Sequence, residues 1–373
     1  MSLAKLRARL QKQYAEGLVD YEEENRKRYT RVSTGSLALD VVLGGGWVQG
    51  RLHEINGIPS VGKSSLMLAS MAEQQKAYPD KAVCYIDMEQ TFDPDWAELF
   101  GVELLSDRFI HLYPEHAEDV SDMLKEVLMS NEVSCVVIDS IGGMESMKAF
   151  EKNAADAIVG KSAQVITRML KNAAVQARKH DATVLFVNQL RANIGAIMGG
   201  DISAGPKSLP YSVSTKVKLT RGGNPPRKIR EDGADVPVAH EVRCKIEKCK
   251  VYPAEGKVAT FYLVTKDSEK YGPVGIDRLD EAVNVGIRTG AIIQSGAYYT
   301  MPNGERIKSR DSVVEAMEGD PALVELVREK AISLMEENKE EGKSVSPVES
   351  KLKEALEASE MKTETFVAEA EGD

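Results

Sequence analysis

Apolar residues in this chain fall into short continuous runs separated by longer amphipathic stretches. Three runs, at residues 81–89, 133–140 and 182–189, are nearly continuous and end in polar positions. Such runs are typical of parallel strands that are buried on both faces of a sheet. Residues 120–129 and 156–180 instead carry apolar side chains at three- and four-residue spacing, which predicts helices. The alternation predicts an α/β core with a largely parallel central sheet.

The pattern changes to period two after residue 212. Residues 214–221, 241–252 and 259–265 alternate polar and apolar positions, which predicts an antiparallel extension of the sheet. The segment between the first two, residues 221–237, predicts a hairpin loop. Residues 190–209 are rich in Gly, Ser and Ala and show no period, so they predict either a functional loop or a flexible surface loop.

The two ends of the chain differ from the core. Leu3, Leu6 and Leu10 predict a polar helix with one apolar face, and a short strand follows at 29–32. The helix and strand would cap the core or reach a neighbouring subunit. Near the other end, a helix at 320–335 predicts a small α+β domain. We therefore expect four parts, which are residues 1–32, 33–276, 277–338 and an acidic, disordered tail at 339–373.

The composition is that of a globular protein without a membrane segment. The chain has 373 residues, and none of its apolar runs approaches the roughly 20 residues of a membrane span. Its first residues lack the apolar centre of a signal peptide, so we expect a cytoplasmic protein. The four cysteines form no C-x-x-C pair. Reduced, structural cysteines are therefore expected rather than a metal site.

Charge is unevenly distributed along the chain. The net charge is −10, but residues 336–373 contain twelve acidic and five basic residues, which leaves −3 for the remainder. A nearly neutral body does not exclude DNA binding. The acidic tail would either compete with nucleic acid for a basic surface or serve only solubility.

A phosphate-binding motif interrupts the first part of the core. It lies between a predicted strand at 51–56 and a predicted helix at 65–78 and reads Gly57-Ile58-Pro59-Ser60-Val61-Gly62-Lys63-Ser64, followed by Ser65. The motif fits the P-loop pattern, in which backbone N–H groups at the start of a helix bind phosphate oxygens. We expect Lys63 to reach the β- and γ-phosphates and Ser64 to bind Mg²⁺. The alternative is a glycine-rich turn before an ordinary helix.

Polar residues end each of the three buried runs. In an open α/β sheet, ligands bind at the carboxyl ends of the strands. Asp139 ends one run in the pattern of an aspartate that holds Mg²⁺ or its water. Asp87 and Glu89 end another, and Glu89 is the better candidate to orient an attacking water; either could instead cap the following turn. Asn188 and Gln189 end the third, where an amide can contact the γ-phosphate.

The motifs together resemble the bacterial RecA family of recombinases, from about residue 30 to 335. The resemblance rests on their order and spacing: Thr34-Gly35-Ser36-Leu37-Ala38-Leu39-Asp40, the P-loop, Ile86-Asp87-Met88-Glu89 with Phe92-Asp93-Pro94, Val137-Ile138-Asp139-Ser140, and Asn188-Gln189-Leu190-Arg191 with Ile194-Gly195. It implies a RecA-type P-loop ATPase core with an N-terminal helix-strand arm and a small C-terminal domain. It also implies a DNA-dependent ATPase with ATP and Mg²⁺, which forms helical filaments on single-stranded DNA and exchanges strands with double-stranded DNA.

The resemblance also assigns roles within the ATP site. Glu89 would be the catalytic carboxylate, assisted by Lys63, and Gln189 would couple the γ-phosphate to the loop at 190–209. Asp93 and Trp96 would contact adenine. Lys248 and Lys250 match lysines that reach the ATP of the adjacent subunit in the homo-oligomer.

Two DNA-binding loops are implied by the same resemblance. The first would be residues 153–160, ending in Val159 and Gly160. The second would be the loop at 190–209. The DNA-binding residues would be Val159 and Gly160 in the first loop, and Lys161, Gln164, Arg168 and Lys171 at the start of the helix that follows it. In the second loop they would be Arg191, Asn193, Ile194, Gly195, Ile197, Met198 and Lys207.

Departures from the family and two other functions complete the sequence evidence. The P-loop interior, residues 58–61, differs from the usual Pro-Glu-Ser-Ser, and Pro206 and Pro210 replace a Gly and a Lys. These differences suit a divergent member, of bacterial or phage origin. One alternative is a RecA-fold motor or regulator, such as a hexameric helicase or a clock-type ATPase without strand exchange. Another is a nucleotide-binding structural protein whose ATPase rate is indifferent to DNA.

Overall fold

The computed structural model describes residues 3–13, 30–144, 155–192, 201–203, 206 and 208–340. The described chain divides into two compact units. The first contains residues 1–35, 46–221 and 243–258, and the second contains residues 36–45, 222–242 and 259–373. The acidic tail predicted at 339–373 lies outside the described residues from 341 onward, and the four predicted domain bounds stay predictions.

The first unit is built on a mostly parallel sheet, which confirms the predicted α/β fold class. Its strands follow the order β11-β9-β3-β7-β6-β4-β5, with β8 paired to β7. Every neighbouring pair of strands from β9 to β5 is parallel. The elements of this unit are α1 (Leu3–Gln13), β1 (Arg31–Val32), β2 (Trp47–Val48), β3 (Leu52–Gly57), α4 (Lys63–Ala77), β4 (Ala82–Asp87), α5 (Pro94–Leu99), β5 (Phe109–Leu112), α6 (Ala117–Met129), β6 (Val133–Asp139), η2 (Ile141–Gly143), α8 (Ala155–His180), β7 (Thr183–Ala192), β8 (Asp201–Ser203), α9 (Leu209–Ser212) and β9 (Thr215–Arg221).

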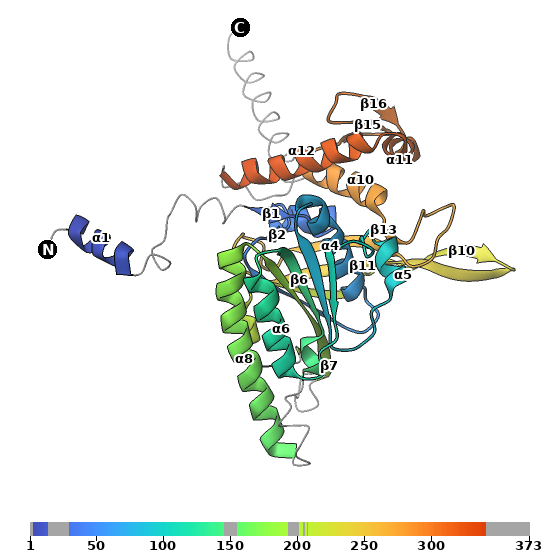
Figure 1. Cartoon of the computed structure of the whole chain (residues 1–373). Helices are drawn as coiled ribbons and strands as arrows, with labels where there is room; N and C mark the ends of the chain where they lie inside the picture. The colour runs from blue at the N-terminus through green and yellow to red at the C-terminus, as the bar shows by residue number, and fades with distance from the viewer. Residues whose placement is uncertain are drawn as a thin grey trace, which may run out of the picture. The chain divides into compact units, whose positions relative to one another are not determined.

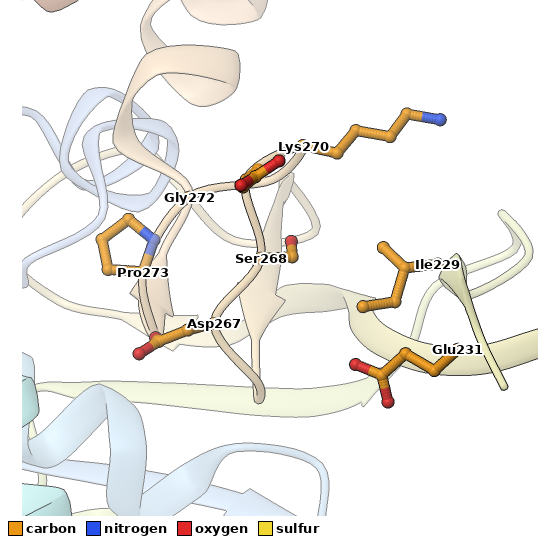
Figure 2. Close-up of a pocket in the computed structure, with 8 residues that line it drawn as sticks. Ile229, Glu231, Asp267, Ser268, Lys270, Gly272 and Pro273 are labelled. Carbon is orange, nitrogen blue, oxygen red and sulfur yellow. The ribbon is translucent and has the colours of Figure 1, made fainter.

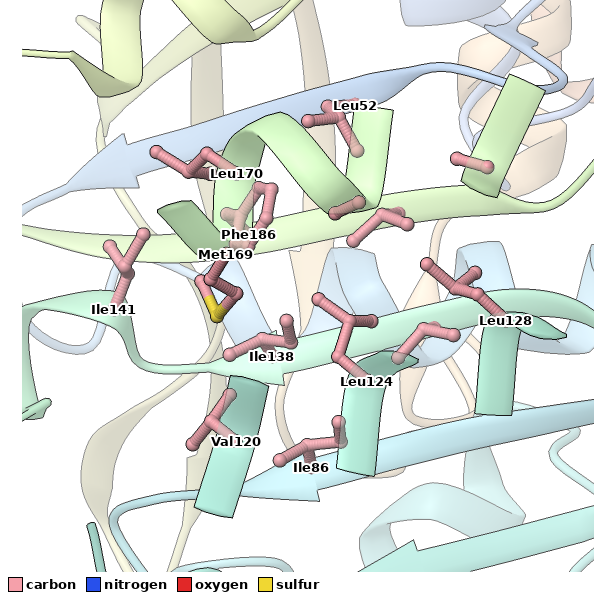
Figure 3. Packing of buried hydrophobic residues seen from close by; sticks show 14 of the residues in the cluster. Leu52, Ile86, Val120, Leu124, Leu128, Ile138, Ile141, Met169, Leu170 and Phe186 are labelled. Carbon is pink, nitrogen blue, oxygen red and sulfur yellow. The ribbon is translucent and has the colours of Figure 1, made fainter. Parts of the chain in front are cut away.

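Helices cover the apolar strands, which explains why these strands read as continuous apolar runs. Helices α6 and α8 run side by side along the sheet (Figure 1). Their apolar side chains pack on alternate residues of the strands, such as Ile86, Ile138 and Phe186 (Figure 3). The intervening strand residues are buried as well, and α4 contacts the strands β3, β4, β6 and β7. Burial on both sides leaves only the strand ends for polar chemistry.

Two features of this unit correct the sequence expectations. The strand β9 was expected in an antiparallel extension, but it pairs with β3 in parallel, from His53 opposite Thr215 to Gly57 opposite Leu219. A period-two pattern reveals which residues are buried but not the direction of the strand. The segment 190–209 was expected to lack structure, but its ends form an antiparallel pair in which Leu190 lies opposite Ser203.

The second unit joins three distant stretches of the chain. Its elements are α3 (Leu37–Leu43), β10 (Arg227–Glu231), the first part of β11 (Ala234–Cys249), β12 (Val258–Val264), β13 (Gly275–Ile276), α10 (Arg278–Thr289), β14 (Ile293–Ser295), β15 (Tyr298–Thr300), β16 (Arg306–Lys308), α11 (Arg310–Gly319) and α12 (Pro321–Glu340). The last three strands form a small antiparallel sheet, and β10 pairs with β11 as a hairpin.

A buried carboxylate ties the early helix α3 to the late helix α10 within this unit. Glu281 accepts hydrogen bonds from Ser36 Oγ at 2.5 Å, Leu37 N at 2.9 Å and Ala38 N at 3.0 Å. The N–H groups at the start of α3 are therefore satisfied by a residue that follows about 240 positions later. Asp40 of α3 likewise forms an ion pair with Arg328 of α12 at 3.3 Å.

Candidate active site

The glycine loop joins β3 to α4, as the sequence predicts. A Cβ atom at Gly57 would lie 2.6 Å from the carbonyl oxygen of Leu219, so a larger residue would force the sheet apart. Gly62 has a φ angle of 104° directly before α4, a left-handed conformation that favours glycine. Both glycines let the backbone approach closely at the start of a 15-residue helix, whose first N–H groups attract anions.

Lys63 lies folded against this loop. Its Nζ atom donates to the carbonyl oxygens of Gly57 at 3.1 Å and Ile58 at 2.9 Å. Burial lowers the pKa of Lys63, while the carboxylates of Asp139 and Glu89 act in the opposite direction. The lysine is therefore close to two acidic groups of the strand ends and offers its charge to an anion in the loop.

Ser64 and Asp139 meet at the carboxyl ends of the strands. The Ser64 hydroxyl donates to Asp139 Oδ2 at 2.9 Å, and the Tyr85 hydroxyl donates to the same oxygen at 2.8 Å. Burial raises the pKa of Asp139, although both hydroxyls favour its charged form. A hydroxyl and a carboxylate are the oxygen donors that Mg²⁺ prefers, and the exposed Ser64 side chain makes the pair accessible. These two residues therefore fit the Mg²⁺ expected with ATP.

Asp87 and Glu89, which end the same predicted strand, take different positions in the structure. Strand β4 ends at Asp87, which is fully buried and accepts hydrogen bonds from Glu89 N at 3.1 Å and Phe92 N at 3.0 Å. It caps the turn, which is one of the roles expected for either acid. Glu89 lies beyond the strand with an exposed side chain.

The side chains of Glu89 and Gln189 meet across the strand ends. Gln189 Nε2 donates to Glu89 Oε1 at 2.5 Å, and Ser140 Oγ donates to the same oxygen at 2.5 Å. The backbone of Gln189 is held by Asn188, whose Oδ1 accepts from Gln189 N at 2.9 Å. The structure thus brings together the carboxylate and the amide that the sequence predicted separately.

Trp96 lies on the helix α5 next to the phosphate loop. Asp93 caps this helix by accepting from Trp96 N at 3.1 Å. The indole Nε1 of Trp96 donates to Ser65 Oγ at 3.3 Å. The aromatic ring is therefore fixed one residue away from the predicted Mg²⁺ ligand Ser64. The roles of Asp93 and Trp96 at adenine stay predictions.

Lys248 and Lys250 occupy the end of β11 beside α9. Lys248 Nζ donates to the carbonyl oxygens of Pro210 and Val213, the latter at 3.0 Å, and Lys250 Nζ donates to Tyr211 O at 2.9 Å. Burial and the neighbouring charge of Lys250 lower the pKa of Lys248 to about 8. Their predicted contact with the ATP of a neighbouring subunit stays a prediction.

Seven of the predicted DNA-binding residues belong to the described helix α8 or strand β7. Gln164, Arg168 and Lys171 are exposed on α8 at helical spacing. This helix begins at Ala155, so the expected loop at 153–160 is wrong from that residue onward, because the helix starts earlier. The remaining predictions are placed as follows: Val159, Gly160 and Lys161 lie in α8 and Arg191 in β7, without described side chains, and Asn193, Ile194, Gly195, Ile197, Met198 and Lys207 lie outside the described residues.

Three residues at this site were not assigned a role from sequence. Ser140 and Tyr85 contact Glu89 and Asp139, respectively. Arg221 donates to the carbonyl oxygen of Ser60 in the P-loop at 2.6 Å. The position of Ser140 directly after Asp139 was a usable signal, whereas the contact of Arg221 depends on β9 lying beside β3.

A separate pocket lies within the second unit and contains no predicted site residue. Figure 2 shows it between the end of the β10 strand and the turn at 267–273. Its lining mixes Ile229 with Glu231, Asp267, Glu269 and Lys270.

Within the described part of the chain, no cluster of three or more His, Cys, Asp or Glu side chains could hold a metal ion. The helices in that part are also all too short or too polar to cross a membrane.

The strand, glycine loop, helix and opposing aspartate define a P-loop α/β protein. A family model described as the RecA N-terminal domain matches residues 2–266. Protein RecA of Thioalkalivibrio sulfidiphilus is 34% identical over 278 residues, which cover 74% of this chain and 76% of that protein. Protein RecA of Rippkaea orientalis is 30% identical over 330 residues, covering 85% and 89%, and Protein RecA of Thermotoga neapolitana is 32% identical over 301 residues, covering 79% and 81%. The chain belongs to the RecA family.

Proposed function

We propose that this protein is a DNA-dependent ATPase that assembles on single-stranded DNA and pairs it with a homologous duplex. The observation that carries the proposal is the meeting of Glu89 with Gln189 beside the Ser64–Asp139 pair. Three relatives named Protein RecA cover most of the chain and support the same assignment. The proposal includes filament formation, DNA repair and a cytoplasmic location.

The chemistry assigns each group of the site a task in hydrolysis. The P-loop backbone and Lys63 bind the phosphates. Ser64 and Asp139 would hold Mg²⁺, which would supply positive charge beside the phosphate oxygens. Glu89 orients the attacking water and takes its proton. Gln189 contacts the γ-phosphate, so that the amide is drawn away from Glu89 whenever ATP is present.

Gln189 also supports the proposed link between ATP and DNA. It lies on β7, which continues through Arg191 to Ala192 into the segment proposed to bind DNA. A movement of Gln189 at the γ-phosphate can therefore be transmitted along β7 to the proposed DNA-binding segment. The exposed Arg168 and Lys171 on α8 would contact phosphates, which gives binding that is independent of sequence.

The deciding experiment measures ATP hydrolysis as single-stranded DNA is added. The proposal expects a strong rise in turnover that saturates with DNA, and helical filaments in electron micrographs with an ATP analogue. A rate indifferent to DNA would contradict it and favour a nucleotide-binding structural protein. DNA stimulation with closed rings and without strand exchange would instead favour a motor or regulator.

A further inference from the structure

Glu89 is held at two points, one on its backbone and one on its carboxylate. Asp87 accepts the N–H groups of Glu89 and Phe92 and so fixes the turn after β4. Within that turn, Gln90 has a φ angle of 53°, a conformation that few residues other than glycine adopt readily. The turn is therefore constrained, and the position of the Glu89 backbone with it.

Ser140 holds the carboxylate itself. Its Oγ atom donates to Glu89 Oε1 at 2.5 Å, and its own side chain is almost fully buried. The same oxygen accepts the amide of Gln189. Two donors on Oε1 leave Oε2 as the oxygen that can accept a proton from water.

The hydroxyl of Ser140 is diverted from its usual local role. Ser140 directly precedes the 3₁₀ helix η2, a position where serine commonly caps the first N–H groups. Its side chain makes no such capping bond. The hydroxyl instead reaches a residue 51 positions earlier in the chain. Local structure therefore does not account for a buried serine at this position, whereas contact with Glu89 does.

We propose that Ser140 is a positioning residue for Glu89. It binds Oε1 of Glu89, so that Oε2 is left to accept the proton of the attacking water. Asp87 fixes the turn that carries the Glu89 backbone. The proposal rests on the proposed role of Glu89 in ATP hydrolysis. When ATP draws Gln189 towards its γ-phosphate, Ser140 remains the donor that keeps the carboxylate in place. Catalysis then depends on Ser140 through its contact with Glu89.

The test compares Ser140→Ala with a matched control on β6, the strand that ends just before Ser140. Ser134, which lies in β6, is fully buried like Ser140, but its hydroxyl faces the Ala82 carbonyl oxygen at 3.4 Å. Ser140→Ala should lower kcat for ATP by about 10- to 100-fold, the range expected when a catalytic group is misplaced. ATP affinity, measured by Trp96 fluorescence, and thermal stability should stay near wild type. Ser134→Ala should leave kcat unchanged.

Two further variants separate positioning from a structural effect. Ser140→Thr keeps the hydroxyl and should recover most of the kcat, and Asp87→Asn should lower kcat with little change in KM. An unchanged kcat in Ser140→Ala, or losses of kcat and ATP affinity together, would overturn the inference. If Ser140→Thr does not fold, Ser140→Ala alone still tests the inference, because a positioning role lowers kcat and leaves the affinity for ATP unchanged.

The basal rate distinguishes this inference from the proposed function. Turnover of the wild-type protein without DNA stimulation would overturn the proposed function alone, because Ser140→Ala can still be compared on the basal rate. Absence of any turnover in the wild-type protein would overturn both.

Discussion

The hydroxyl of Ser64, in the first turn of the P-loop helix, donates to the carboxylate of Asp139 at 2.9 Å. This contact joins the phosphate loop to the end of β6. If the pair binds Mg²⁺, Asp139→Asn should weaken ATP binding in the presence of Mg²⁺ by about 10- to 100-fold. Titrations of Trp96 fluorescence with and without Mg²⁺ measure this difference. Tyr85→Phe is the control, since it removes the other donor to Asp139 but leaves both predicted ligands. Equal affinities with and without Mg²⁺ in wild type would refute the metal role.

Glu89→Gln should retain ATP binding and lose hydrolysis. The amide keeps the shape of the side chain but cannot take a proton from water, and loss of a general base costs about 10²- to 10⁴-fold in rate. Phosphate release gives the rate, and equilibrium titration gives the affinity. Glu126→Gln is a matched control on α6, where the side chain is exposed. Wild-type turnover in Glu89→Gln would rule out the proposed role.

Trp96→Ala should weaken ATP binding if the indole stacks on adenine. Stacking of a base on an aromatic side chain contributes about 1–3 kcal/mol, and Trp96→Phe should keep most of it. Because the substitution removes the one of the two tryptophans that lies beside the P-loop, calorimetry is the suitable measurement. Leu99→Ala serves as the control, since Leu99 is on the same helix and half exposed. Equal affinities for ATP in Trp96→Ala and wild type would place adenine elsewhere.

Glu281 makes the stability of the second unit dependent on pH. Burial raises its pKa from the ordinary value of 4.5 to about 7, although Ser36 and the N–H groups of Ala38 and Leu37 oppose this. Asp40 acts in the same direction as burial, and the nearby Arg288 has a pKa lowered by its own burial. A raised carboxyl pKa stabilises the folded state below pH 4.5, and this contribution is lost as the pH rises to about 7.

The free energy of unfolding of Glu281→Gln, measured relative to that of wild type, should therefore be higher at pH 8 than at pH 5. The glutamine does not titrate, so only the wild-type protein loses this contribution. Urea unfolding at both pH values gives the difference, and Glu318→Gln, an exposed position on α11, should show none. A constant difference between Glu281→Gln and wild type across that range would contradict the prediction.

Sequence patterns predicted the core strands because burial on both faces leaves continuous apolar runs. The strands β4, β6 and β7 were found in this way, within a few residues. The predicted direction of β9 was wrong. Its partner β3 lies about 160 positions away in the chain, and no local pattern encodes that pairing. The pair formed by Leu190 and Ser203 was also missed, because backbone hydrogen bonds require no apolar pattern.

The candidate site was predictable in its residue types but not in its contacts. Asp87 and Glu89 are two positions apart, as in residues on one face of a strand. Their side chains differ in burial because β4 ends at Asp87 and Glu89 lies beyond it. The need for glycine at positions 57 and 62 was easier to predict, because Gly57 and Gly62 belong to the P-loop motif. Ser140, in contrast, was visible only as a neighbour of Asp139. Its contact with Glu89 follows from strands β4 and β6 lying side by side.

The bond between Ser36 and Glu281 has a consequence for synthesis of the chain on the ribosome. The two residues are separated by 245 positions, so the acceptor for the start of α3 is translated long after α3 itself. At a synthesis rate of about 5–20 residues per second, the delay is roughly 10–50 s. During that interval the apolar residues of α3 and their unpaired N–H groups are available to a chaperone. The second unit can close only when nearly the whole chain has emerged.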